Sequence, residues 1–220
     1  EVHGPAAEGG ELIESPAAVI RDIAVNHAGL AEGDIDSTAY TAAENARVNW
    51  KAAMNLADYE GSAAGALEEI ARQSCLAIDW SMGTLRLVVL QNDLASITAD
   101  LTFTDANTIL NSRAQQGVDN VRVTTEALIE YTEFGEPRKM RVRASTVAQF
   151  GVLKDDETWK YWAYDHTNPV QASAAFWLHR KGQALSPVSG AAWTNSLRLQ
   201  LGDHVQITCP EFPLVSGASK

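Results

Sequence analysis

The clearest helical pattern in the chain lies between residues 13 and 43, where apolar positions recur at helical spacing. One face of a helix collects four side chains at the i, i+3, i+4, i+7 positions: Val19, Ile20, Ile23 and His27. Ser15 is a suitable N-cap, Pro16 fits the first helical position, and Gly29 tolerates the positive φ of a helix end. The pattern predicts a helix over residues 16–28, with His27 packed in the core.

Two further helices are predicted in the first half of the chain. Asp36 or Ser37 can cap a helix that begins near Thr38, and residues 48–59 either continue it or form a strand. Ser62 precedes another amphipathic helix over residues 63–74. Its inward positions are Leu67, Ile70 and Ala71. This half therefore begins as a set of capped helices.

Alternating or continuous apolar runs then predict strands. Residues 76–80 and 84–90 flank a glycine-containing turn, which is typical of a β-hairpin. Residues 120–133 alternate as one long strand, which the turn at 135–137 leads back into residues 138–145. An aromatic strand is predicted over residues 158–165. A final hairpin is expected from 196–201 and 204–208, around Gly202 and Asp203.

The remaining helices complete an α+β pattern of antiparallel hairpins with inserted helices. Residues 144–151 predict one short helical turn, and Asn168-Pro169 opens a helix that Gly182 closes. We expect two small subdomains: a helical one with a β-hairpin over residues 12–100, and an α+β one over residues 101–212. Residues 1–11 are expected to form a loop or linker, and residues 213–220 a tail.

The charge of the chain argues against nucleic-acid recognition. The 220 residues carry a net charge of −11, whereas duplex-binding proteins usually need a basic face. Basic residues gather mainly at Lys139, Arg141 and Arg143, which alternation places on one face of a strand. That face is either solvated or in contact with an acidic neighbouring subunit. No apolar run reaches membrane-spanning length, so we expect no membrane insertion and no sequence-specific nucleic-acid partner.

No motif of the chain predicts a catalytic, cofactor or metal site. The acidic run at residues 34–38 begins like a calcium loop, but Ala39 and Asn45 occupy its diagnostic glycine and glutamate positions. The carboxylates of residues 155–157 are adjacent, which suits a solvated turn better than a glycosidase pair. The histidines lack metal-site spacing, and no nucleophile-elbow motif is present. These patterns predict a protein that is not an enzyme and needs no cofactor.

Cys75 and Cys209 are the only cysteines. Neither belongs to a CxxC motif, so a zinc knuckle is excluded. Two buried free thiols are expected, and a bridge between them stays open.

The densest aromatic cluster lies on the predicted strand over residues 158–165. Alternation assigns Trp159 and Tyr161 to one face, and Trp162 and Tyr164 to the other. Aromatic rings on both faces predict packing in the core or against another subunit, with a carbohydrate platform as the alternative.

The order of these segments resembles that of bacteriophage tail proteins. Residues 12–43 are similar to a recurring piece with an Asn- or Ser-Pro helix start, an isoleucine-rich helix and a D-I-D-x-x-[FY]-x-x-A helix. Residues 66–88 resemble the family's helix and hairpin, and residues 119–131 resemble its long strand. Residues 145–151 resemble its short Ser-x-x-x-x-[FY]-Gly turn. Residues 168–183 resemble its closing helix, and residues 196–210 its "L-x-x-GD-x-V" hairpin.

The resemblance implies a tail-tip or baseplate hub component of a phage, prophage or phage-like particle. Such hubs commonly form threefold rings, so the expected partners are other tail proteins and further copies in a homotrimer, within a virion tail assembled in the bacterial cytoplasm. The chain is expected to be a fragment that lacks the family's N-terminal tube-like domain. The alternatives are a tail-associated cell-wall or glycan hydrolase and a glycan-binding module.

We expect the interfaces of such a component to use aromatic and basic anchors. The candidate interface residues are Trp159, Tyr161, Trp162, Tyr164, Lys139, Arg141 and Arg143.

Overall fold

The computed structural model describes residues 13–54, 59–80, 83–92, 98–104, 106, 114–115, 123–183, 188–189, 191, 199 and 203–208. The fold is α+β, as predicted. The chain forms two compact units, one from residues 1–92 and 124–183 and the other from residues 93–123 and 184–220. This division differs from the expected boundary after residue 100, because residues 124–183 return to the first unit. The Ala53 N–H, for example, donates to the Ala163 carbonyl at 2.9 Å.

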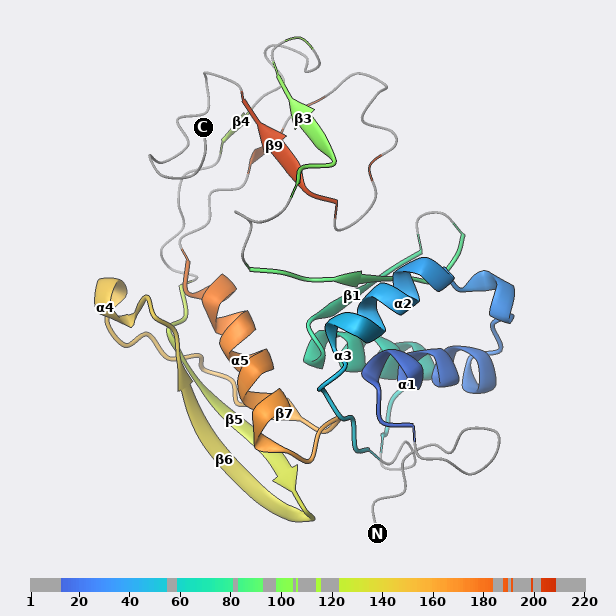
Figure 1. The fold of residues 1–220 in the computed structure, drawn as a ribbon. Coiled ribbons are helices and arrows are strands. Elements are labelled where there is room, and N and C mark those ends of the chain that lie inside the picture. The colour runs from blue at the N-terminus through green and yellow to red at the C-terminus, as the bar shows by residue number, and fades with distance from the viewer. Residues whose placement is uncertain are drawn as a thin grey trace. The chain divides into compact units, whose positions relative to one another are not determined.

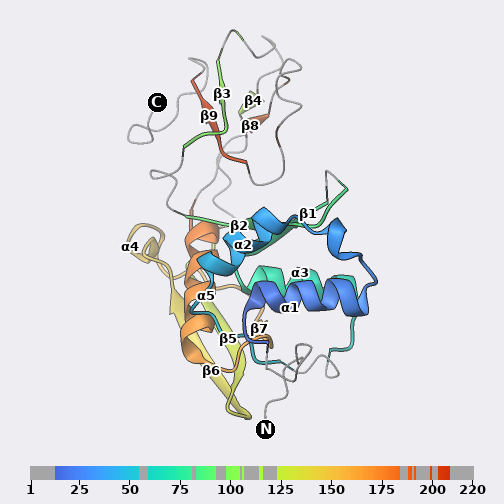
Figure 2. The same ribbon diagram turned by 45° about the vertical axis from the view of Figure 1, so that its right-hand side comes forward.

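The first unit holds most of the regular structure (Figures 1 and 2). Its helices are α1 (Pro16–Asp22), η1 (Ile23–His27), η2 (Glu32–Asp34), α2 (Ser37–Ala46), α3 (Ala63–Gln73), α4 (Val147–Phe150) and α5 (Thr167–Lys181). Its strands are β1 (Leu76–Asp79), β2 (Arg86–Val89), β5 (Glu126–Glu133), β6 (Glu136–Arg143) and β7 (Trp159–Tyr161). Among the described residues, no helix has both the length and the apolar composition that a membrane crossing requires.

The first predicted helix is confirmed in position but changes its winding. Ser15 caps α1, and η1 continues it as a π-helix that ends before Gly29, whose φ is +76°. Wider turns shift the side chains that follow Ile23 around the axis. As a result His27 leaves the apolar face, and 54% of its side chain is exposed. The prediction of a packed core histidine was therefore wrong.

The second and third helices begin where their caps predict. The Asp36 carboxylate accepts the Thr38 and Ala39 N–H groups, and the Ser62 hydroxyl accepts the Gly65 N–H. Residues 48–54 form neither helix nor strand, so both readings of that segment are wrong for its described part.

Arg47 joins the helical layer to the predicted hairpin of β1 and β2, which is confirmed with antiparallel pairing. Its guanidinium donates to the carbonyls of Ser74 (2.7 Å), Cys75 (3.0 Å) and Leu90 (3.3 Å). Burial lowers the pKa of Arg47 below its ordinary value. The end of α3 is thus closed by a side chain from just beyond α2.

A three-stranded sheet of order β6-β5-β7 forms the other half of this unit, and α5 lies along one of its faces (Figures 1 and 2). The strand predicted over residues 120–133 begins only at Glu126 in its described part. The turn to β6 uses Phe134 and Gly135, both with positive φ, rather than residues 135–137. This two-residue loop matches the right-handed twist of its strands.

The short helical turn and the closing helix are confirmed as α4 and α5. Gly182 ends α5 with a φ of −78°, so a left-handed conformation is not what requires glycine there. A Cβ atom at Gly182 would lie 2.7 Å from the Leu178 carbonyl oxygen and 2.6 Å from Thr146 Oγ1. Glycine is therefore required at position 182 because the Leu178 carbonyl and the Thr146 side chain leave no room for a Cβ atom.

Replacing Gly182 with alanine should lower the free energy of unfolding by about 1–3 kcal/mol, because an added methyl group overpacks the contact. Gly33→Ala is the matched control, since a Cβ atom there meets nothing within 4 Å. Urea unfolding of both variants measures the difference. Equal stability of the two variants would contradict the steric explanation.

The second unit contains short strands. The parallel strands β3 (Leu101–Phe103) and β9 (Val205–Ile207) form one pair, and β4 (Ala114–Gln115) and β8 (Val188–Ser189) form an antiparallel pair. A strand near the end of the chain is confirmed by β9, which pairs with β3. The partner predicted for it, residues 196–201, lies outside the described residues except for position 199.

Candidate functional site: the outer edge of the three-stranded sheet

Among the described residues, no strand pairs with the outer edge of β6, the edge that faces away from β5. The two-residue turn makes Glu133 and Glu136 a hydrogen-bonded pair, and such pairs alternate with non-hydrogen-bonded pairs along an antiparallel ladder. The hydrogen bond from the Ala144 N–H to the Thr125 carbonyl fits this alternation, because residues 125 and 144 are the next hydrogen-bonded pair beyond the strand ends. At the positions between these pairs, the backbone groups of β6 point away from β5.

Those outward positions are Pro137, Lys139, Arg141 and Arg143. Proline is tolerated at the first of them because no N–H is needed there for pairing with β5. Among the described residues, β5 is the only strand that pairs with β6. The edge thus offers the N–H groups of Lys139, Arg141 and Arg143 to an added strand.

The side chains of these three basic residues share the sheet face that α5 does not cover, as alternation predicts, and all are exposed. They lie opposite Glu130, Leu128 and Glu126 of β5. Lys139 pairs with Glu130, and Arg143 Nε donates to Glu126 at 2.6 Å. Two of the three basic side chains, those of Lys139 and Arg143, therefore have acidic partners on β5.

These ion pairs keep the two carboxylates charged. The hydrogen bond from Arg143 lowers the pKa of Glu126, and the one from Lys139 lowers the pKa of Glu130. Arg141 lies between them in the ladder, opposite the apolar Leu128. On this face, acidic side chains of β5 lie beside basic side chains of β6, and the basic side chains are the ones at the outer edge of the sheet.

The aromatic segment follows a different course from the predicted strand. Because β7 ends at Tyr161, only Trp159 and Tyr161 share a strand face, beside Ile129 and Tyr131 on the α5 side. Tyr161 and Tyr164 are buried in the core of the first unit, with 2% and 1% exposure.

Trp159 and Trp162 are half-buried and packed against the same core, with Trp162 stacked on Tyr59 at 4.9 Å between ring centroids. Core packing, one of the two predicted roles, is thus confirmed for the tyrosines. Their burial removes both of them from the candidate interface.

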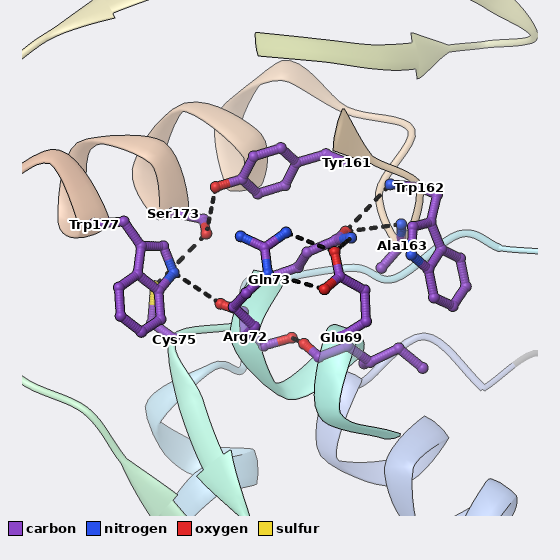
Figure 3. Close-up of polar contacts among 11 residues, drawn as sticks. Glu69, Arg72, Gln73, Cys75, Tyr161, Trp162, Ala163, Ser173 and Trp177 are labelled. Atoms are coloured by element: carbon purple, nitrogen blue, oxygen red, sulfur yellow. Dashed lines mark hydrogen bonds and ion pairs between the residues drawn. The ribbon is translucent and has the colours of Figure 1, made fainter. Parts of the chain in front are cut away.

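Hydrogen bonds from α3 hold this segment in place (Figure 3). The Gln73 side-chain oxygen accepts the N–H groups of Trp162 (3.2 Å) and Ala163 (3.0 Å), and its Nε2 donates to Glu69 at 2.9 Å. Sequence reasoning missed Gln73. The available signal was its position in the apolar stripe of α3, three residues after Ile70.

The hydroxyls of the two tyrosines are also satisfied inside the unit. Tyr164 shares a hydrogen bond with Ser74 at 2.7 Å, and Tyr161 shares one with Ser173 at 3.1 Å. Burial raises the pKa of Tyr161 to about 12, and raises that of Tyr164 as well. Both rings serve as neutral core residues.

Cys75 is a buried free thiol. It donates to Ser173 at 3.7 Å, and burial raises its pKa to about 11. The thiol is therefore protonated near neutral pH and is a poor nucleophile. Cys209 lies outside the described residues.

The acidic turn at residues 155–157 is tied to its surroundings rather than solvated throughout. Asp155 accepts Trp159 Nε1 and Lys181 Nζ, both at 3.0 Å. Burial alone would raise the pKa of Asp155, but these hydrogen bonds and the Glu157 N–H lower it. In the described part of the chain, no three His, Cys, Asp or Glu side chains are grouped as a metal site would require.

Comparison with known proteins found no matching family model and no matching curated protein.

Proposed function

We propose that the chain is a structural component of the tail tip or baseplate hub of a phage or phage-like particle. In this role it joins neighbouring subunits and anchors fibres or other tail parts. The observation that carries the proposal is the open edge of β6, an eight-residue strand with outward backbone groups and a row of basic side chains. An extended segment of another subunit can add to such an edge.

Because the exposed side chains along the edge of β6 are basic, an acidic strand is expected to add to it more favourably than a basic one. Two β6 edges side by side would bring Lys139, Arg141 and Arg143 of each copy together, and like charges across a ladder are destabilising. An acidic segment avoids this repulsion, and the chain carries a net charge of −11. The contact is then between two different surfaces, which generates a closed ring when the rotation between subunits closes. A homotrimer is the ring that the resemblance implies.

Deleting the coding segment from the phage or prophage genome that carries it tests the proposal. We expect particles without complete tails by negative-stain electron microscopy, and tails restored when the gene is supplied in trans. Peptide mass spectrometry of purified wild-type tails should detect the chain. Normal tails from the deletion strain would contradict the proposal.

The β6 edge is tested by Arg141→Pro, which removes an outward N–H and leaves the β5 ladder intact. We expect about tenfold fewer complete tails, because the added strand loses a backbone hydrogen bond at this position. Arg141→Thr is the matched control, because it also loses the charge but keeps the N–H and a good strand former.

Complete tails counted by electron microscopy give the comparison, and thermal unfolding checks that both variants fold. Equal tail numbers for the proline and threonine variants would rule out strand addition at this position.

A further inference from the structure

A cleft of about 490 Å³ opens in the first unit between α3, β7 and α5. Its volume lies in the range of small-molecule sites. The lining residues that matter here are Glu69, Arg72, Glu157, Trp159, Lys160 and Trp177. None of these belongs to β6, so the cleft is separate from the proposed subunit edge.

Two indole rings form the apolar part of the cleft, and their polar atoms are already engaged. Trp177 Nε1 donates to the Arg72 carbonyl at 2.9 Å (Figure 3), and Trp159 Nε1 donates to Asp155 at 3.0 Å. The Lys181 ammonium lies 4.7 Å from the Trp159 ring centroid and helps to fix that ring. The rings therefore offer fixed apolar surface to a ligand.

Three of the charged side chains that line the cleft, those of Glu69, Arg72 and Lys181, have ionic partners within the chain. Arg72 Nε donates to Glu69 at 2.9 Å, and the Arg72 guanidinium also lies 5.7 Å from the Tyr161 ring centroid (Figure 3). Lys181 pairs with Asp155 at 3.0 Å. An ionic ligand would have to compete with these pairs, whereas a neutral ligand leaves them intact. Carboxylate and ammonium groups at the rim can still accept and donate hydrogen bonds.

We infer that this cleft binds a neutral carbohydrate. The apolar C–H face of a sugar ring lies against an indole, while its hydroxyls exchange hydrogen bonds with the Glu69 and Glu157 carboxylates and the Lys160 ammonium. Only a ligand with both an apolar face and many hydroxyls uses both parts of the lining. The inference does not depend on the proposed role in tail assembly, because its residues and its test are different.

Isothermal titration of the full chain tests the inference with three neutral trisaccharides: cellotriose, maltotriose and N,N′,N″-triacetylchitotriose. Sialyllactose and the peptide Lys-Gly-Lys serve as anionic and cationic comparators. We expect saturable binding of at least one neutral trisaccharide and none of either charged probe. Failure of all three to saturate at millimolar concentration, or binding of a charged probe alone, would overturn the inference.

A variant of Trp159, compared with a variant of Trp80 outside the cleft, locates the binding. Trp159→Ala should weaken binding of the trisaccharide by about tenfold or more, equivalent to about 1.4 kcal/mol. Trp80→Ala is the matched control, because Trp80 is 48% exposed and does not line the cleft; its affinity should equal that of the wild type.

If circular dichroism shows that Trp159→Ala does not fold, Glu157→Gln at the exposed rim takes its place, with an expected loss of severalfold in affinity. Wild-type affinity in a folded cleft variant would overturn the assignment.

Discussion

Replacing Gln73 with leucine should lower the free energy of unfolding by about 2–5 kcal/mol. The substitution leaves the N–H groups of Trp162 and Ala163 without their acceptor, and each unsatisfied buried group costs about 1–3 kcal/mol. The Gln73 side chain is fully buried and close to leucine in size, so the loss arises from hydrogen bonding rather than from a cavity. Urea denaturation monitored by circular dichroism gives the value.

Gln171→Leu is the control for this substitution. Gln171 lies on the exposed side of α5, so its replacement should change stability by no more than about 0.5 kcal/mol. If Gln73→Leu were as stable as Gln171→Leu, the Gln73 contacts would not hold the aromatic segment in place.

Replacing Leu178 with alanine should cost about 2–5 kcal/mol of unfolding free energy, from lost burial and a residual cavity. Leu178 is fully buried on α5, the helix that lies along the three-stranded sheet. The first unit should also unfold in one cooperative transition, because its helices α5 and α3 are joined by the hydrogen bond from Trp177 to the Arg72 carbonyl.

The same change at Leu153, which is 38% exposed, provides a Leu→Ala comparison. We expect a loss there of no more than about 0.5 kcal/mol. A similar loss of unfolding free energy at both positions would contradict the assignment of Leu178 to the core-facing side of α5.

The elements that the sequence predicts well depend on neighbouring residues. Ser15, Asp36 and Ser62 each cap a helix from two or three positions away, so local chemistry is enough to find the helix starts. The hairpin of β1 and β2 is local in the same sense. The π-helical winding of η1 has no comparable signal, and His27 was misplaced for that reason.

Long-range pairing explains most of what the sequence could not predict. The parallel pairing of β7 with β5 and the contacts from Gln73 to Ala163 join residues far apart in the chain. Because the strand ends at Tyr161, alternation fails for Tyr164, whose burial depends on Ser74 and Trp50. The return of residues 124–183 to the first unit is a consequence of the same contacts.

For the candidate interface, the basic row was predictable and the aromatic part was not. Lys139, Arg141 and Arg143 alternate on β6, and a period of two is enough to place them on one face. Whether a ring is covered by its own chain depends on tertiary packing, so Tyr161 could not be separated from Trp159 by pattern. The cleft beside Trp177 was missed because it is built from three separate elements.

The proposed scaffold role is tested most directly by cryo-electron microscopy of tails from a phage or prophage whose genome carries the coding sequence of this chain. The reconstruction should contain the first unit at the tail tip or baseplate, arranged around the tail axis, with β6 extended by an acidic strand from a neighbouring subunit. Tails that are complete but lack the chain would contradict the account.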